Sequence, residues 1–129
     1  MIVLDTHAWI WWVSDPEKLS KKATNAIEYA KDIGICSISC WEIATKAARG
    51  KISLDRDIRV WMKQALSRPR LTLLEISADI AITAGFLGDD GFHGDPADRL
   101  IVATAMHHGA ELVTKDKEIQ SFRKIRTIW

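Results

Sequence analysis

Short apolar runs that alternate with helical stretches constrain the fold of this chain more than any other feature. Ile2-Val3-Leu4 is an unbroken aliphatic run, which is typical of a strand buried on both faces. Four further strand-like runs follow, at residues 34–38, 71–76, 111–114 and 126–129. Strands that alternate with helices form a mainly parallel sheet through right-handed crossovers, and helices cover both of its faces. The pattern therefore predicts an α/β fold, a three-layer α/β/α sandwich.

The helices between these runs are predicted from their caps and from the spacing of apolar residues. Ser39 and Glu42 match the S-x-x-E capping box, which predicts that a helix opens at Ser39. Asp95 and Pro96 are typical of a cap and a first-turn proline. The predicted helices cover residues 8–13, 19–30, 39–50, 57–66, 78–87, 96–108 and 116–122.

The length and composition fit one domain with a packed core. The chain has 129 residues, of which 47% are hydrophobic, and it shows no repeat, linker or low-complexity segment. It has neither a long apolar stretch nor a basic opening region, so we expect no membrane span and no signal peptide. Cys36 and Cys40 match neither a zinc motif nor a disulfide framework. We expect a single domain, residues 1–129, in the cytoplasm.

Four acidic residues lie where a strand run ends or a helix begins. They are Asp5, Glu42, Asp98 and Asp116. In a parallel α/β sheet these points lie along the carboxyl edge of the strands, where such folds bind ligands. Carboxylate oxygens are the ligands that Mg²⁺ and Mn²⁺ prefer. The pattern predicts a divalent-metal site built from the four carboxylates.

Each of these acids also has a purely structural interpretation. Asp5 and Asp116 could be helix N-caps, and Glu42 could only complete its capping box. Asp98 could favour the helix dipole, although it shares a helical face with apolar residues and should point inward over the sheet. Four carboxylates at one edge repel each other unless a cation is present, which favours the metal site. On this argument Asp5→Asn should relieve repulsion in the metal-free protein.

A basic stripe continues from Glu42 along its helix. Lys46 and Arg49 follow at i+4 and i+7, and Lys51 extends the stripe. A solvent-exposed Glu42–Lys46 pair is the structural interpretation, worth about 0.3 to 0.5 kcal/mol, and phosphate binding is the functional one. The chain has 18 basic and 17 acidic residues; if metal neutralises four acids, 17 − 4 leaves 13, an excess of five positive charges. Such a surface suits a polyanion.

Tryptophan and histidine are the remaining candidates for binding nucleic acid or metal. The six tryptophans could stack bases, but in amphipathic helices they are more often core or interface anchors. Because several lie in the first helix, we predict a subunit contact there and a homodimer. His7 lies beside Asp5 and is the histidine best placed to touch the site, and no histidine is assigned a catalytic role.

Taken together, the motifs resemble those of the PIN domain, and specifically the VapC-type toxins of toxin-antitoxin pairs. The resemblance covers nearly the whole chain, the motifs occur in the order typical of the family, and their combination is specific. The matching segments are Leu4-Asp5-Thr6-His7-Ala8, Ser39-Cys40-Trp41-Glu42-Ile43-Ala44 with Lys46 following, Asp95-Pro96-Ala97-Asp98-Arg99-Leu100-Ile101, and Val113-Thr114-Lys115-Asp116.

The resemblance implies a metal-dependent endoribonuclease, its catalytic acids and its metal ions. Asp5, Glu42, Asp98 and Asp116 would be the catalytic acids and would hold one or two Mg²⁺ or Mn²⁺ ions, which activate the attacking water. It also implies a homodimer and a small VapB-like antitoxin protein that blocks the site. Asp95 is interpreted as an N-cap that could also reach the metal through water. The substrate is left open among transfer, ribosomal and messenger RNA.

Two other functions would also use an acidic sheet edge. A receiver-like signalling domain binds Mg²⁺ there, but it needs a phosphoacceptor aspartate after a central strand, whereas the second strand leads into Ser39 and Glu42. A catalytically silent binding module would keep the fold for a partner alone. The presence of all four acids favours the enzyme over the silent module.

Overall fold

The protein, described over all 129 residues by a computed structural model, has one central sheet. Its strands are β1 (Ile2–Leu4), β2 (Ile33–Cys36), β3 (Leu71–Leu74), β4 (Glu111–Val113) and β5 (Thr127–Ile128). The strand order is β3-β2-β1-β4-β5, and all four neighbouring pairs are parallel. The predicted α/β class is confirmed, and the sheet is wholly parallel.

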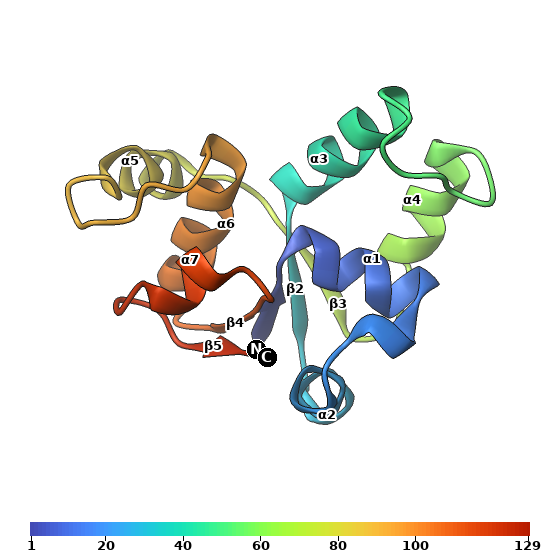
Figure 1. The fold of residues 1–129 in the computed structure, drawn as a ribbon, viewed down its shortest axis with the longest axis horizontal. Coiled ribbons are helices and arrows are strands. Elements are labelled where there is room, and N and C mark those ends of the chain that lie inside the picture. Colours follow the sequence, from blue (N-terminus) through green and yellow to red (C-terminus); the bar gives the residue numbers. More distant parts are fainter.

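Helices cover both faces of this sheet. Figure 1 shows α5, α6 and α7 gathered on one side of the strands and α1 and α4 on the other. The three-layer prediction is therefore confirmed. The helices are α1 (Thr6–Ser14), α2 (Lys21–Tyr29), α3 (Ser37–Ala48), α4 (Ile58–Leu66), α5 (Ala78–Phe86), α6 (Pro96–His107) and α7 (Lys117–Ser121), with a short 3-10 helix η1 (Pro16–Lys18). No helix is both long enough and apolar enough to cross a membrane.

The unbroken apolar strands supply both layers of the core. Successive side chains of a strand point to opposite faces, so Val3 packs in the cluster on the α5–α6 side and Leu4 in the cluster on the α1–α4 side. On the second side Trp9 of α1 and Trp61 of α4 are almost fully buried, with ring centroids 5.7 Å apart. These two tryptophans are core residues, as the sequence predicts.

The strand order places a topological switch point between β1 and β4. From β1 the chain moves to β2 and β3 on one side, and it returns to β4 and β5 on the other. Leu4 pairs with Val113 at the carboxyl end of both strands, and the Asp5 amide donates to the Val113 carbonyl at 3.0 Å. Ligands of open α/β sheets bind in this crevice, so the switch point marks where to look for a site.

The predicted start of α3 is wrong. The helix begins at Ser37, directly after β2, and Cys36 is its N-cap without a side-chain hydrogen bond. Ser39 is therefore inside the helix and fully buried, so the capping box with Glu42 does not form. The S-x-x-E pattern does not set the start of the helix here, because β2 runs straight into α3. Ser39 is instead directed toward Thr6 of α1.

Candidate active site

Asp5 is the anchor of the carboxyl edge. It follows β1 and is only 4% exposed. Its Oδ1 accepts a hydrogen bond from the Thr6 amide at 2.8 Å, and its Oδ2 accepts from Thr114 Oγ1 at 2.7 Å. The N-cap interpretation is thus correct, but the second bond also ties Asp5 to the strand β4 at the switch point. The carboxylate is held in one orientation from both sides.

Glu42 is connected to Asp5 through the neighbouring threonine. Thr6 Oγ1 hydrogen-bonds Glu42 Oε1 at 2.5 Å and Ser39 Oγ at 2.8 Å. Because a hydroxyl carries one proton, Thr6 donates it to one of these two acceptors at a time. Burial raises the pKa of Glu42, while the bond from Thr6 and the charge of Lys46 oppose that rise. Glu42 is therefore positioned over the edge by α1 and α3 together.

Asp116 is also a cap, at the start of α7. Its Oδ1 accepts from the amides of Glu118 and Ile119 at 2.9 and 3.0 Å, and its own amide donates to Thr114 Oγ1 at 3.0 Å. Thr114 thus uses one hydroxyl to bond both Asp5 and Asp116. This arrangement leaves Asp116 Oδ2 free of hydrogen bonds and available to a ligand.

Asp98 differs from the other acids because its carboxylate accepts no hydrogen bond from the protein. Its amide is capped by Asp95 Oδ1 at 2.8 Å, which makes Asp95 the N-cap of α6. Burial raises the pKa of Asp98 to about 7, and the charges of Asp5, Asp95, Asp116 and Glu42 add to the rise. That set of neighbours shows that the four predicted acids meet at one edge and that Asp95 lies with them.

His7 touches the site but does not face it with a free nitrogen. Its Nδ1 lies 3.5 Å from Asp5 Oδ2, and its Nε2 accepts the Lys115 amide at 3.0 Å. Burial lowers the pKa of His7, against the charges of Asp5 and Asp116, which raise it. A neutral imidazole with its proton on Nδ1 satisfies both contacts. Each nitrogen thus has a neighbour within the protein.

The three residues predicted to contact phosphate lie in two different places. Lys46 is half-buried on α3, and its charge lowers the pKa of both Glu42 and His7, so it lies at the acidic edge. Arg49 and Lys51 are exposed at the far end of α3, beyond which Gly50 adopts φ 68°. Only Lys46 is brought to the acids.

The donor set suits a divalent cation, although the side chains are not drawn together around one. No group of three or more Asp, Glu, His or Cys side chains is close enough, as the side chains stand, to hold a metal ion. The candidate ligands are nevertheless all carboxylates, the chemistry that Mg²⁺ and Mn²⁺ prefer. Burial raises the pKa of Asp98, and repulsion between the carboxylates adds to the rise; a bound cation would offset this repulsion.

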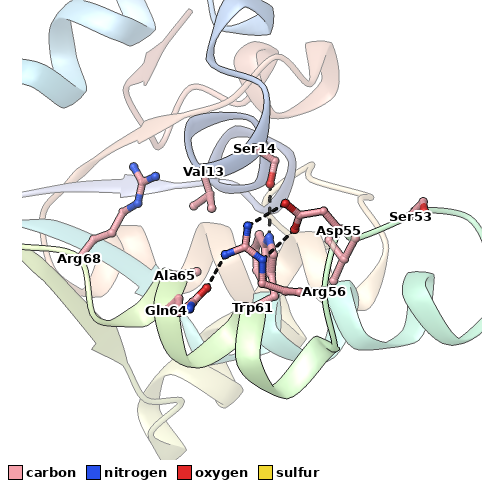
Figure 2. Close-up of a pocket in the computed structure, with 10 residues that line it drawn as sticks. Val13, Ser14, Ser53, Asp55, Arg56, Trp61, Gln64, Ala65 and Arg68 are labelled. Atoms are coloured by element: carbon pink, nitrogen blue, oxygen red, sulfur yellow. Dashed lines mark hydrogen bonds and ion pairs between the residues drawn. The ribbon is translucent and has the colours of Figure 1, made fainter.

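The largest cavities of the molecule lie away from these acids. One, of about 440 Å³, lies between the end of α1 and α4 and contains none of them. Figure 2 shows Arg56 held in this cavity by Asp55 and Gln64, while the Trp61 indole points to Ser14. Several of its polar groups are thus paired with each other, and none of the four acids lines it.

Exposed apolar side chains are not where the tryptophan-rich first helix predicts them. Trp9 is fully buried, and Trp11 and Trp12 are half-buried. None of the large apolar residues that are exposed lies on α1: they are Met1, Tyr29 on α2, Trp41 on α3, Val60 on α4, Leu73 on β3, and Ile82 and Phe86 on α5. A subunit contact made by α1 alone has little exposed apolar surface to use.

Three hydroxyl residues were not predicted as part of the site. Thr6, Ser39 and Thr114 are all buried, and they link the acids of different elements to each other. Each lies within one of the motif segments, one to three residues from an acid. That position is the signal that could have identified them, because a buried hydroxyl next to a buried carboxylate needs it as a partner.

Comparisons with known proteins agree with this geometry. The family model described as the PIN domain matches residues 2–126. A ribonuclease VapC22 of Mycobacterium tuberculosis is 40% identical over 130 residues, which cover 99% of this chain and 98% of the relative. The chain also superposes on VapBC2 from Rickettsia felis, bound to a promoter DNA fragment, with TM-score 0.71, 21% identity and coverage of 98% and 97%. A toxin-antitoxin complex from Klebsiella pneumoniae gives TM-score 0.70, 24% identity and coverage of 97% and 95%.

Proposed function

Since the chain belongs to the PIN-domain family, we propose that it is a VapC-type endoribonuclease that requires Mg²⁺ or Mn²⁺ and is neutralised by an antitoxin. The receiver-like alternative is wrong, because the family match spans residues 2–126. A silent module with the same fold stays the competing proposal, and the acids of the sheet edge decide between the two.

The observation that carries the proposal is the state of Asp98. Its carboxylate has no hydrogen-bond partner, and burial together with four neighbouring acids raises its pKa to about 7. A fold that only binds a partner gains nothing from this repulsion. A site that takes up a divalent cation uses it, because the cation binds most strongly where anions are concentrated.

Asp5, Glu42, Asp98 and Asp116 would hold the cation in this proposal. The chemistry that bound Mg²⁺ or Mn²⁺ supplies is the acidification of a water molecule and the neutralisation of charge on the phosphate. The hydrogen bonds from Thr6 and Thr114 orient Glu42 and Asp5 before any ligand arrives.

Basic residues beside the acids would position the RNA backbone. Lys46 lies at the edge and is suited to a phosphate flanking the cleaved bond. Arg49 and Lys51 are exposed further along and would contact more distant phosphates. His7 keeps Asp5 and the Lys115 amide in place and would exchange no proton with substrate.

The proposal extends to assembly and setting. A small VapB-like antitoxin would silence the site most directly by inserting an arginine or lysine among the carboxylates, where it gains charge-assisted hydrogen bonds. We also propose a single domain over residues 1–129, a homodimer and a cytoplasmic setting. Light scattering at tens of micromolar tests the dimer, and a monomer at that concentration contradicts it.

A cleavage assay tests the function directly. Purified protein is incubated with total RNA in EDTA, in Mg²⁺ and in Mn²⁺, and the new RNA ends are sequenced. Specific cuts that need the cation, and that Glu42→Gln abolishes, support the enzyme. RNA that stays intact under all conditions, while the folded protein still binds an antitoxin, would support the silent module.

A further inference from the structure

Three aromatic rings form a half-exposed cluster at one end of the sheet edge. The centroids of His7 and Trp11 are 5.1 Å apart, those of Trp11 and Trp129 are 5.8 Å apart, and those of His7 and Trp129 are 6.2 Å apart. All three residues are half-buried. Lys115 Nζ lies 5.6 Å from the Trp11 ring centroid. We name this group, His7, Trp11, Trp129 and Lys115, the aromatic cluster.

The aromatic cluster lies directly beside Asp5 and Asp116. His7 Nδ1 lies 3.5 Å from Asp5 Oδ2, and Lys115 stands between Thr114, which bonds Asp5, and Asp116. The Lys115 amide donates to His7 Nε2 at 3.0 Å, which fixes the ring relative to the strand end. A molecule bound at the acids would therefore have aromatic faces and one exposed cation directly beside it.

Other tryptophans of the chain have a different environment. Trp9 and Trp61 contact each other inside the core and present no surface. Trp12 is half-buried, but it faces away from the acids and is covered by the Arg68 guanidinium, 4.8 Å from its ring centroid. Core packing explains the first two rings fully, whereas Trp11 and Trp129 pack only partly against the core and stay half-exposed beside His7.

We propose that the aromatic cluster stacks a base of single-stranded RNA next to the cleaved bond, with Lys115 at the adjoining phosphate. The inference rests on the proposed ribonuclease function and adds to it a base-binding position at the aromatic cluster. Bases can stack only where they are unpaired and turned outward, so loops and unpaired ends are the expected substrates rather than duplex.

Stacking of this kind has a recognisable kinetic signature. The stacked base takes no part in bond cleavage, so its contact is equally strong before and during the reaction. Losing it should raise KM while kcat stays nearly unchanged. A single stacked base is expected to change KM about 10-fold.

The test removes the base and the ring separately. Short single-stranded RNAs carry the mapped cleavage site, and one abasic nucleotide is moved through the flanking positions. For the parent, the abasic nucleotide should raise KM about 10-fold at one position beside the cleaved bond. In Trp129→Leu that KM difference should disappear, and Trp129→Phe should retain part of it. Trp12→Leu, which removes an equally half-buried tryptophan elsewhere, should behave as the parent.

The outcomes separate this inference from the function on which it rests. If no abasic position changes KM, or if the KM difference persists in both Trp129→Leu and Trp11→Leu, the stacking surface is excluded. Equal antitoxin affinity of Trp129→Leu and parent supports a substrate role, whereas loss of antitoxin binding alone overturns it. If the parent cuts no RNA, the ribonuclease proposal fails. Fluorescence anisotropy of labelled oligonucleotides in EDTA then tests stacking alone. The parent should bind the abasic RNA more weakly than the intact RNA, whereas Trp129→Leu should bind the two equally.

Discussion

The two acids that follow strands and the two acids carried by helices are held in opposite ways. Asp5 and Asp116 follow β1 and β4, and each uses one oxygen to cap the helix that begins there. Thr114 lies between them and bonds both residues. Glu42 and Asp98 project from α3 and α6, where burial raises the pKa of both. The first pair is fixed by hydrogen bonds to the ends of helices, whereas in the second pair Glu42 has only the bond from Thr6 and Asp98 has none.

This difference shows how one site can be both rigid and receptive. Hydrogen bonds to Asp5 and Asp116 stabilise the fold even when no ligand is present, so these residues contribute to stability and to the site together. The charge on Asp98 opposes folding until a cation or a proton neutralises it. Asp5 and Asp116 would therefore define the position of a bound cation, and Glu42 and Asp98 would set the affinity of the site for it.

The largest expected effect comes from removing a strand acid. Asp5→Ala should lower cleavage at least about 1000-fold, because a cation ligand worth several kcal/mol is lost. It should also lower the free energy of unfolding by about 2 kcal/mol, since the Thr6 amide loses its cap and the buried Thr114 hydroxyl loses its acceptor. Urea unfolding and a cleavage assay on one preparation measure both.

The matched control is the N-cap of α4. Asp57 is exposed and caps the Arg59 amide at 3.0 Å. Asp57→Ala should lose about 1 kcal/mol of stability and keep full activity. If Asp5→Ala behaved like Asp57→Ala, Asp5 would be a cap and nothing more, and the metal site would be in doubt.

Adding cation should stabilise the folded protein by the next largest amount. At 100 times the dissociation constant the gain is about 2.7 kcal/mol, because only the folded state gathers the carboxylates. Since protons compete for Asp98, whose pKa is about 7, the increase in melting temperature with Mn²⁺ should be larger at pH 8 than at pH 6. A pH-independent increase would place the cation elsewhere.

The shared hydroxyl of Thr114 offers a smaller test of the rigid pair. Thr114→Val keeps the shape of the side chain but removes the bonds to Asp5 and to the Asp116 amide. Activity should fall about 10- to 100-fold, as is typical of groups that orient metal ligands. Thr104→Val is the control: Thr104 is equally buried, but its hydroxyl bonds Leu100 and Cys36 within the core. Similar activity losses in both variants would show that the effect is general packing.

The smallest expected effect concerns the charge on Asp98. Its folded-state pKa, about 7, lies above its unfolded value, so the stabilisation from its proton is complete below about pH 4 and is lost as pH rises through 7. In the metal-free protein, Asp98→Asn should therefore gain about 1 kcal/mol relative to the parent at pH 8, once solvent screening is allowed for, and clearly less at pH 5.

Asp79 is the comparison for this variant, because it occupies the first turn of α5 as Asp98 occupies that of α6. Asp79 is exposed, and Asp79→Asn should show no gain between pH 5 and pH 8. Thermal melts of both variants and the parent across this range are sufficient. A loss of stability in Asp98→Asn at pH 8 would mean that the acids do not repel each other.

The sequence predicts the layers and the acidic edge, and physical reasons set the limit of that prediction. Strand runs such as Ile2-Val3-Leu4 are identified because a strand covered on both faces must be apolar throughout. A parallel sheet then brings the residues after its strands to one edge, which is why the sequence alone predicts that Asp5 and Asp116 lie there. The local pattern wrongly predicts Ser39 as a helix N-cap, because it cannot reveal that β2 passes directly into α3.

Contacts between distant residues could not be predicted. The bond from Thr114 to Asp5 joins residues 109 positions apart and reverses the effect expected of Asp5→Asn. An asparagine at this position would turn an amide group toward one of its two donors, so it should weaken the metal-free fold rather than relieve it. Relief belongs to Asp98, whose carboxylate accepts no hydrogen bond.

The pairing of β1 with β4 has a consequence for the time at which this protein becomes dangerous to the cell that makes it. Asp5 is synthesised 109 residues before its partner Thr114, and its other partner, Val113, is next to Thr114 in the chain. A nascent chain on the ribosome can form β1, β2 and β3 early, but the central strand then lacks one neighbour and Asp5 lacks its second hydrogen bond. The nuclease site is thus completed only after Thr114 has been synthesised, which leaves an interval in which an antitoxin made beforehand can already be present.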